Sequence, residues 1–176
     1  MQIRLRPWQW SDIPNIVRIC NNVHVWNNLR DQMPRPYTVR DAEEWVRYNK
    51  HLKPTRNFCI ECDGQMVGGI GMVPQDDIYK RNAEIGYYVG EDFWGRGICT
   101  EAVRQIVDHV FATTDCVRIY AGVFSHNLGS MAVLRKNAFH LEAVHHKAIF
   151  KNDRLLDEHL WVRFRPGYEP TATADI

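Results

Sequence analysis

The stretch Gly90-Glu-Asp-Phe-Trp-Gly-Arg-Gly-Ile-Cys-Thr-Glu-Ala-Val-Arg-Gln-Ile-Val107 sets the organisation of this chain. Residues 82–89 before its glycines alternate polar and apolar side chains, which predicts a strand. Apolar residues in 102–111 recur at helical spacing, which predicts a helix. Gly95 and Gly97 stand between the two elements. Glycines allow a tight turn, and the first amides of a helix lack intrahelical partners. The pattern therefore indicates an anion site, because those amides and the helix dipole favour a phosphate.

The loop lacks two motifs that are typical of common phosphate ligands. A Walker loop requires a Gly-Lys-Ser/Thr ending, and no such lysine is present. A dinucleotide fingerprint requires a third glycine where Thr100 stands. Arg96 and Thr100 could contribute a cation and a hydroxyl to an anion. Taken alone, the two glycines are equally compatible with a purely structural turn.

Length and charge limit the functional classes. With 176 residues, the chain is expected to form one ordinary domain. Its 22 Lys+Arg and 21 Asp+Glu leave a net charge of +1, so no overall basic field points to nucleic acid. The first residues carry charges where an export signal has its apolar core, and no apolar run reaches bilayer length. We therefore expect a soluble, cytoplasmic protein without a membrane partner.

Cys59 and Cys62 have the spacing of a redox or zinc half-site. They fall in a predicted strand, however, where residues three apart face opposite sides. No second ligand pair at a recognisable spacing accompanies them. We therefore expect reduced structural thiols and no metal.

The remaining elements follow from periodicity and from turn residues. Ser11 and the pair Thr38–Asp41 are the expected start signals of the first two helices. Residues 21–37 have no clear period and are either a recognition loop or a plain connector. The expected strands are 2–6, 57–62, 65–73, 82–89, 117–124, 139–150 and 155–164, and a short helix is expected over 128–137.

This order of elements, with four motifs, resembles the GNAT superfamily of N-acetyltransferases and its Rim-type branch, the ribosomal-protein N-terminal acetyltransferases. The motifs are Pro36-Tyr-Thr-Val-Arg-Asp-Ala-Glu-Glu44, Ala83-Glu-Ile-Gly-Tyr87, Phe93-Trp-Gly-Arg-Gly-Ile-Cys-Thr-Glu-Ala102 and Asn127-Leu-Gly-Ser-Met-Ala-Val-Leu-Arg-Lys-Asn-Ala-Phe139. The resemblance implies an α+β, three-layer fold. Its central mixed, mostly antiparallel sheet has about seven strands with helices on both faces. The single domain spans 1–165 and is followed by a tail, 166–176.

The sequence departs from the family pattern at two positions. Cys99 replaces a small Ala or Gly in the glycine loop, and it is small enough to keep the turn. Ala138 replaces the usual Gly before Phe139. If that position requires a positive φ, Ala138 is strained and the helix ends differently.

The resemblance implies that the phosphate belongs to acetyl-coenzyme A. The expected contacts to the pyrophosphate are the backbone amides of Gly95, Arg96, Gly97, Ile98, Cys99 and Thr100. Tyr88 and Val89 are expected to pair with the pantetheine amides like a further strand. Asn127 matches a cofactor-fixing position, although it is also suited to be only a helix N-cap.

Acetyl transfer to an amine requires a neutral nucleophile and a proton for the departing thiolate. Glu84 is the expected base, acting directly or through water, and a structural role that anchors a loop is equally compatible. Ser130 matches the Rim-branch serine and is the expected proton donor, because Leu134 stands where some relatives have a tyrosine. A backbone amide near Val89 or Gly90 is expected to meet the carbonyl. Weaker candidates are Glu61, Tyr87, Tyr120, His126, His145 and His146.

The expected acceptor site combines part of the segment 21–37 with the final hairpin. In this architecture Trp26, Arg30, Arg35, Tyr37 and the final hairpin are expected to line its groove. A terminal amine has a pKa near 8 and a lysine amine near 10.4, so a modest base favours the former. A protein N-terminus is the leading acceptor. The alternatives are a small amine, such as a polyamine or an aminoglycoside, which the arginines disfavour, and a non-catalytic acetyl-CoA-binding module. Relatives are monomers or dimers, so a homodimer is possible.

Overall fold

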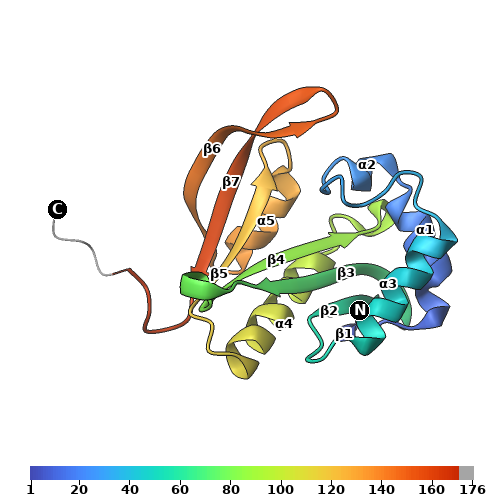
Figure 1. Ribbon diagram of the computed structural model, residues 1–176, viewed down its shortest axis with the longest axis horizontal. Helices are drawn as coiled ribbons and strands as arrows, with labels where there is room; N and C mark the ends of the chain where they lie inside the picture. Colours follow the sequence, from blue (N-terminus) through green and yellow to red (C-terminus); the bar gives the residue numbers. More distant parts are fainter. Residues whose placement is uncertain (171–176) are drawn as a thin grey trace.

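The computed structural model describes residues 1–170 and contains one seven-stranded sheet (Figure 1). Along the sheet the strand order is β1-β2-β3-β4-β5-β7-β6, and only the β4–β5 pair is parallel. The sheet is therefore mixed and mostly antiparallel, as predicted. The strands are β1 Ile3–Arg6, β2 Asn57–Cys62, β3 Gln65–Pro74, β4 Asn82–Val89, β5 Arg118–Phe124, β6 His140–Lys151 and β7 Arg154–Phe164.

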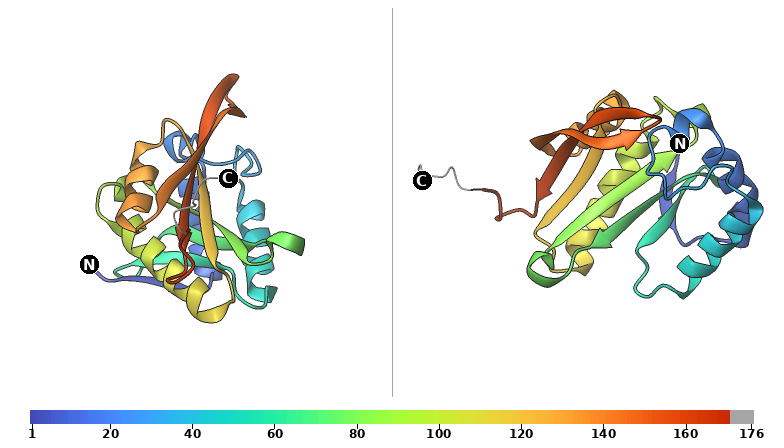
Figure 2. Two further views of the ribbon diagram at one scale, coloured as in Figure 1. Left: turned by 90° about the vertical axis from the view of Figure 1, so that its left-hand side faces the viewer. Right: turned by 45° about the horizontal axis from the view of Figure 1, so that its top comes forward.

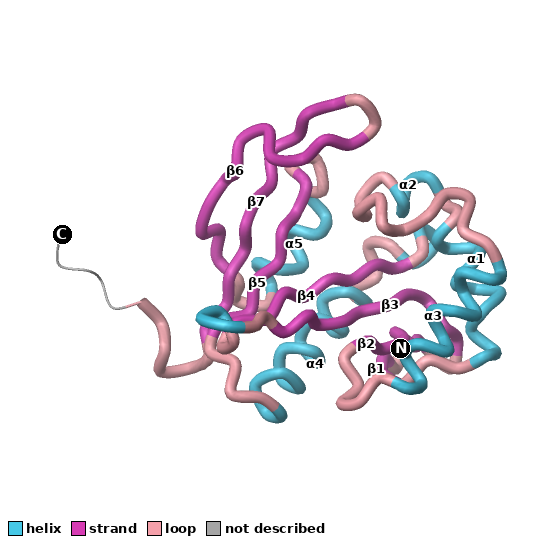
Figure 3. Tube along the Cα trace, viewed as in Figure 1, coloured by secondary structure: helices cyan, strands magenta, loops and turns pink. Residues whose placement is uncertain are grey.

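Helices cover both faces of the sheet, which confirms the three-layer prediction (Figure 3). One apolar cluster joins the sheet to α4 and α5, and the other joins it to α1, α2 and α3. Cys59 lies in the second cluster and Cys62 in the first, so they face opposite sides and form no half-site. The helices are α1 Ile13–Cys20, α2 Val23–Trp26, α3 Val39–His51, α4 Ile98–Thr113 and α5 Leu128–Lys136.

The start of the first helix differs from the prediction. Ser11 is not its N-cap, because a 3-10 turn spans Trp10–Asp12 and α1 begins only at Ile13. The Asp12 carboxylate accepts from the backbone amide of Gln9 and from the Arg6 guanidinium, which holds this turn in place. The second start signal is confirmed: Thr38 and Asp41 form a capping box at α3.

The parallel pair β4–β5 is short, and this shapes the centre of the molecule. Only Asn82, Ala83 and Glu84 have β5 partners, whereas β4 continues to Val89 and β5 to Phe124. Beyond Glu84 the two strands diverge (Figure 1). Each strand stays paired on its outer side, β4 with β3 and β5 with β7. The divergence therefore opens a gap whose two inner edges have no strand partner within residues 1–170.

Ala138 adopts φ +58° at the end of α5, in the left-handed region that favours glycine. The Ala138 amide donates to Arg135 O at 3.1 Å, and the Phe139 amide donates to Leu134 O at 3.1 Å. These two bonds form the Schellman ending that normally uses glycine. The helix thus keeps the usual ending despite the alanine, and the backbone strain remains.

Candidate active site

A cavity of about 700 Å³ occupies the gap between the diverging strands and extends under the α2–α3 segment. Strands β3, β4 and β5 with the start of α5 supply one part of its wall, and α3 with the loop before it supplies another. The residues that line this cavity include Asn28, Arg30, Tyr37, Asp41, Glu44, Glu84, Gly86, Tyr87, Tyr88, Gly122, Asn127, Ser130 and Glu158. A second cavity of about 420 Å³ adjoins it and shares Arg30, Glu84, Gly122 and Glu158.

The glycine turn places the N-terminus of α4 just after β4. Gly95 and Gly97 have φ +73° and +78°, and a Cβ at either position would meet no atom within 4 Å. The turn therefore needs glycine for its backbone angles, and the space beside it is open. The side-chain amide of Asn137 donates to Thr100 O at 3.1 Å, which connects the start of α4 to the end of α5. The Arg96 guanidinium lies over the Phe93 ring, 5.7 Å from its centroid.

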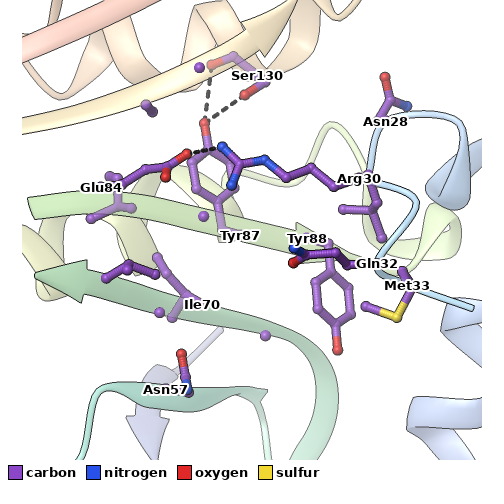
Figure 4. A pocket seen from close by; sticks show the side chains of 18 of the residues that line it. Asn28, Arg30, Gln32, Met33, Asn57, Ile70, Glu84, Tyr87, Tyr88 and Ser130 are labelled. Carbon is purple, nitrogen blue, oxygen red and sulfur yellow. Dashed lines mark hydrogen bonds and ion pairs between the residues drawn. The ribbon is translucent and has the colours of Figure 1, made fainter. Parts of the chain in front are cut away.

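At the end of β4, two backbone groups are already engaged. The Gly90 amide donates to Val67 O at 2.9 Å, and the Trp94 indole N–H donates to Val89 O at 3.0 Å. The Gly90 amide, one of the two expected from the sequence to meet the acyl carbonyl, is therefore not free to do so. The Tyr88 side chain points away from the gap into the α1–α3 layer, and burial raises its pKa well above the usual value (Figure 4).

Glu84 and Arg30 face one another across the cavity (Figure 4). The Arg30 guanidinium, on the segment between α2 and α3, donates to Glu84 Oε1. Glu84 is largely buried, with 19% of its side chain exposed, whereas 62% of Arg30 is exposed. The carboxylate is thus both a candidate base and the anchor of the loop that carries Arg30, so both roles predicted for Glu84 fit the geometry.

Ser130 lies in the first turn of α5 and contacts Tyr87 from β4 (Figure 4). The two hydroxyl oxygens are 2.8 Å apart, and the Tyr87 hydroxyl also lies 3.3 Å from Ser130 O. Burial raises the pKa of Tyr87 above its usual value, which keeps this hydroxyl protonated. Asn127 caps α5 by accepting from the Ser130 amide at 3.1 Å, which leaves the Asn127 side-chain NH₂ for another partner.

Comparison with known proteins identifies the architecture. The family model for the acetyltransferase (GNAT) domain matches residues 2–140, which is most of the chain. The chain belongs to the GNAT acetyltransferase family. It is therefore an N-acetyltransferase, and acetyl-CoA is its acetyl donor.

Individual relatives of this acetyltransferase cover several substrates. A probable N-acetyltransferase of Bacillus subtilis is 36% identical over 76% of each chain. The spermidine N(1)-acetyltransferase of Escherichia coli K12 is 27% identical over 80% of this chain and 74% of that protein. The ribosomal-protein-serine acetyltransferase of the same strain is 29% identical over 82% of each chain. Among solved structures, RimJ of Mycobacterium smegmatis with a CoA disulfide superposes with TM-score 0.82, at 25% identity over 96% of this chain and 85% of that one.

Only some of the residues predicted to bind the acceptor line the cavity of the acetyltransferase. Arg30 and Tyr37 line the cavity, although Tyr37 is 6% exposed. Trp26 and Arg35 are not among the lining residues. Instead, the Arg35 guanidinium lies 5.3 Å from the Trp26 ring centroid, and the Trp26 indole N–H donates to Met33 O at 2.9 Å. These two residues shape the loop rather than the wall of the cavity.

The weaker candidates have other partners. Glu61 accepts from Arg4 and Arg6, which lower the pKa of its carboxyl group, and it does not line the cavity. His146 contacts Asp157 at 3.0 Å. Tyr120 lines only the second cavity, where burial raises its pKa. Burial also raises the pKa of the Cys99 thiol to about 12, so this departure from the family pattern adds no reactive thiolate.

Three carboxylates of the acetyltransferase cavity were not predicted as site residues: Asp41, Glu44 and Glu158. The capping-box pattern indicated only a structural role for Asp41. Glu158 reaches the site because β7 pairs with β5, a register that local periodicity does not reveal. With Glu84, four carboxylates and one cation, Arg30, line the cavity in the described part of the chain. The lining is therefore acidic. The sequence had indicated the opposite, because its arginines disfavoured a small cationic acceptor.

Within residues 1–170, no helix is both long and apolar enough to cross a bilayer. Over the same residues, no three His, Cys, Asp or Glu side chains are grouped so as to hold a metal ion.

Proposed function

We propose that this acetyltransferase, with its catalytic unit in residues 1–165, transfers acetyl to the N-terminal amine of a protein. The observation that carries the proposal is the gap between β4 and β5. It has the glycine turn at one end and the acidic cavity, with Glu84 and Arg30, at the other. A long thioester donor and an amine acceptor can thus enter from different sides and meet between Tyr87 and Gly122.

The donor half of the gap suits acetyl-CoA. The amides of residues 97–100 are the free first amides of α4 and would hold the pyrophosphate, with Arg96 beside them. The inner edge of β4 at Tyr88 and Val89, apart from Val89 O, which the Trp94 indole occupies, would bind the pantetheine amides as an added strand. The side-chain NH₂ of Asn127 would donate to the same chain. Acetyl-CoA supplies the thioester, and the protein's own groups supply orientation and proton transfer.

The acceptor amine arrives protonated and must lose a proton before it attacks. An ordered water between the amine and Glu84 would pass this proton to the carboxylate, because only one Glu84 oxygen is occupied by Arg30. The nitrogen then bonds to the acetyl carbon as the carbon–sulfur bond breaks. The second amine proton goes to Ser130, where it replaces the proton that Ser130 gives to the departing sulfur.

Ser130 would donate its proton to the departing sulfur. Tyr87 prepares this step when its hydroxyl donates to the Ser130 oxygen, which turns the serine proton toward the gap. The raised pKa of Tyr87 keeps it a donor across the working pH range. Tyr87 is thus a positioning residue that acts through Ser130.

A small polycationic amine is the second candidate, and the acidic lining favours it. Arg30 is neutralised by Glu84, and Arg35 lies outside the cavity, so neither arginine is a free receptor for an acidic acceptor. An N-terminus followed by basic residues would satisfy the same electrostatics. Both candidates therefore predict that positive charge near the reacting amine improves binding.

A thiol-release assay with acetyl-CoA tests the proposal. The panel contains two peptides with free N-termini, Ser-Lys-Lys-amide and Ser-Glu-Glu-amide, together with spermidine and an aminoglycoside. The preferred substrate should be the basic peptide. A preference for spermidine would favour the second candidate. Tight acetyl-CoA binding without turnover of any amine would identify a non-catalytic binding module. Glu84→Gln should lower kcat by about 10²-fold if Glu84 is the base, and a merely structural Glu84 should leave kcat near wild type.

A further inference from the structure

Glu158 projects from β7 into the gap between the diverging strands. It pairs across the ladder with Phe124, and its side chain lies over Gly122, which is two residues before that partner. A Cβ at position 122 would stand 2.4 Å from Glu158 Oε1, so the carboxylate occupies the space that glycine leaves. Glu158 lines both cavities, and so does Glu84. The two carboxylates thus belong to the same junction between the cavities.

The carboxylate of Glu158 is held on one side only. Its Oε2 lies 3.1 Å from His145 Nδ1, on the neighbouring strand β6. Within residues 1–170, no side chain or amide donates to Oε1, the atom that packs against Gly122. With 26% of the side chain exposed, Glu158 is fixed in position yet accessible from the cavity.

Each of the other lining carboxylates has a charged or hydroxyl partner on one of its oxygens. Glu84 is paired with Arg30, Asp41 accepts from Thr38, and Glu44 is paired with Arg40. Within residues 1–170, Glu158 alone among the carboxylates of the cavity lining has no arginine, lysine or hydroxyl partner. A carboxylate oxygen without a donor in a partly enclosed space favours an ammonium group.

We propose that Glu158 is an acceptor-binding residue that holds the protonated reacting amine before Glu84 removes its proton, and that His145 positions it. This inference rests on the proposed function. It gives the two carboxylates separate tasks, because Glu84 keeps its cation Arg30 while Glu158 offers a free oxygen to the substrate. Gly122 is required because any side chain there would displace the carboxylate.

Steady-state kinetics of Glu158→Gln test this assignment, with spermidine and Ser-Lys-Lys-amide as probes. The acceptor KM should rise by about tenfold or more, since a charged hydrogen bond is lost. The Kd for acetyl-CoA should stay within about twofold. Glu142→Gln is the matched control, because Glu142 is another carboxylate of the hairpin, paired with Arg118, and lines neither cavity. It should leave both constants unchanged.

Two further variants separate geometry from charge. Gly122→Ala keeps the Glu158 charge but displaces the flexible end of its side chain, so it should raise the acceptor KM as Glu158→Gln does. The two changes combined should not be additive. His145→Leu should raise the acceptor KM, whereas His145→Asn keeps a donor near Glu158 and should restore it.

The outcomes distinguish the inference from the function on which it rests. An active wild type whose Glu158→Gln variant keeps its acceptor KM for both probes overturns the inference alone. A wild type that turns over no amine of the panel overturns the proposed function, and the acceptor site falls with it.

Discussion

The ammonium nitrogen of Lys151 lies 3.1 Å from the centroid of the Trp26 ring. Lys151 ends β6, and its side chain is only 3% exposed. The same nitrogen contacts Asp31 at 2.5 Å, and the next residue, Asn152, donates to Asn27 at 3.0 Å. The tip of the final hairpin therefore fastens the segment that carries Arg30 over the acceptor cavity (Figure 2).

Lys151→Met should remove the contacts of the ammonium group with Trp26 and Asp31 while keeping an unbranched apolar side chain. We expect the free energy of unfolding to fall by about 1–2 kcal/mol, because a buried cation–π contact and one ion pair are lost. The acceptor KM should rise severalfold while acetyl-CoA affinity stays constant. Lys147→Met, at an exposed position on the same strand, is the control for both measurements. An unchanged acceptor KM would show that the hairpin contact is structural only.

Tyr87→Phe should lower kcat by about tenfold, and Ser130→Ala by about 10²-fold. The reason is that the phenylalanine variant loses only the hydroxyl that orients Ser130, 2.8 Å away. The double variant should be no slower than Ser130→Ala, because Tyr87 acts through the serine. Single-turnover rates at saturating substrates check this, with Tyr168→Phe as the control. Additive losses would mean that Tyr87 acts on the substrate independently.

Gly97→Val should weaken acetyl-CoA binding, because Gly97 has φ +78° at the start of α4 and a β-branched residue resists that angle. Gly64→Val is a matched control: Gly64 has φ +83° in the β2–β3 turn and also has open space around it. Both variants should lose about 1–2 kcal/mol of stability. Only Gly97→Val should raise the Kd of acetyl-CoA, as measured by calorimetry. Equal Kd values in the two variants would remove the glycine turn from the donor site.

Ala138→Gly should stabilise the protein by about 1 kcal/mol, since glycine accepts φ +58° without the Cβ clash. Urea unfolding measures the change. Ala132→Gly, inside α5, should do the opposite by a similar amount, because glycine in a helix interior costs about 1 kcal/mol. A destabilising Ala138→Gly would contradict the inference that the alanine is strained at this position.

Glu61→Gln should lower stability at neutral pH by about 2 kcal/mol, through the loss of charged hydrogen bonds to Arg4 and Arg6. Because these arginines hold the folded-state pKa of Glu61 below its ordinary value of 4.5, its contribution is fully present above that value. The contribution is lost as the pH falls from about 4.5 through the lower folded-state pKa. Unfolding curves of the wild type and the variant should therefore converge in acid, and a gap that stays constant to pH 2 would contradict this.

Patterns among neighbouring residues were sufficient to predict most of the helices and strands. The alternation in 82–89, the glycine pair and the helical stripe after it correspond to β4, the turn and α4, because each depends only on neighbouring residues. The capping box at Thr38 was predicted for the same reason. Ser11 was assigned wrongly as an N-cap because Arg6, on another element, attracts the carboxylate of the adjacent Asp12 and sets the turn. The short helix α2 was not predicted, since four residues give no detectable period.

The sequence by itself determined the layered fold, the glycine turn at the start of α4, and the presence of Glu84 and Ser130 on the elements beside it. Only the tertiary structure decided which groups meet there. Tyr87 with Ser130, Arg30 with Glu84, and Glu158 over Gly122 each join distant segments of the chain. Such contacts depend on strand register and on the path of a loop between helices. Both are fixed by packing across the whole sheet rather than by the residues on either side.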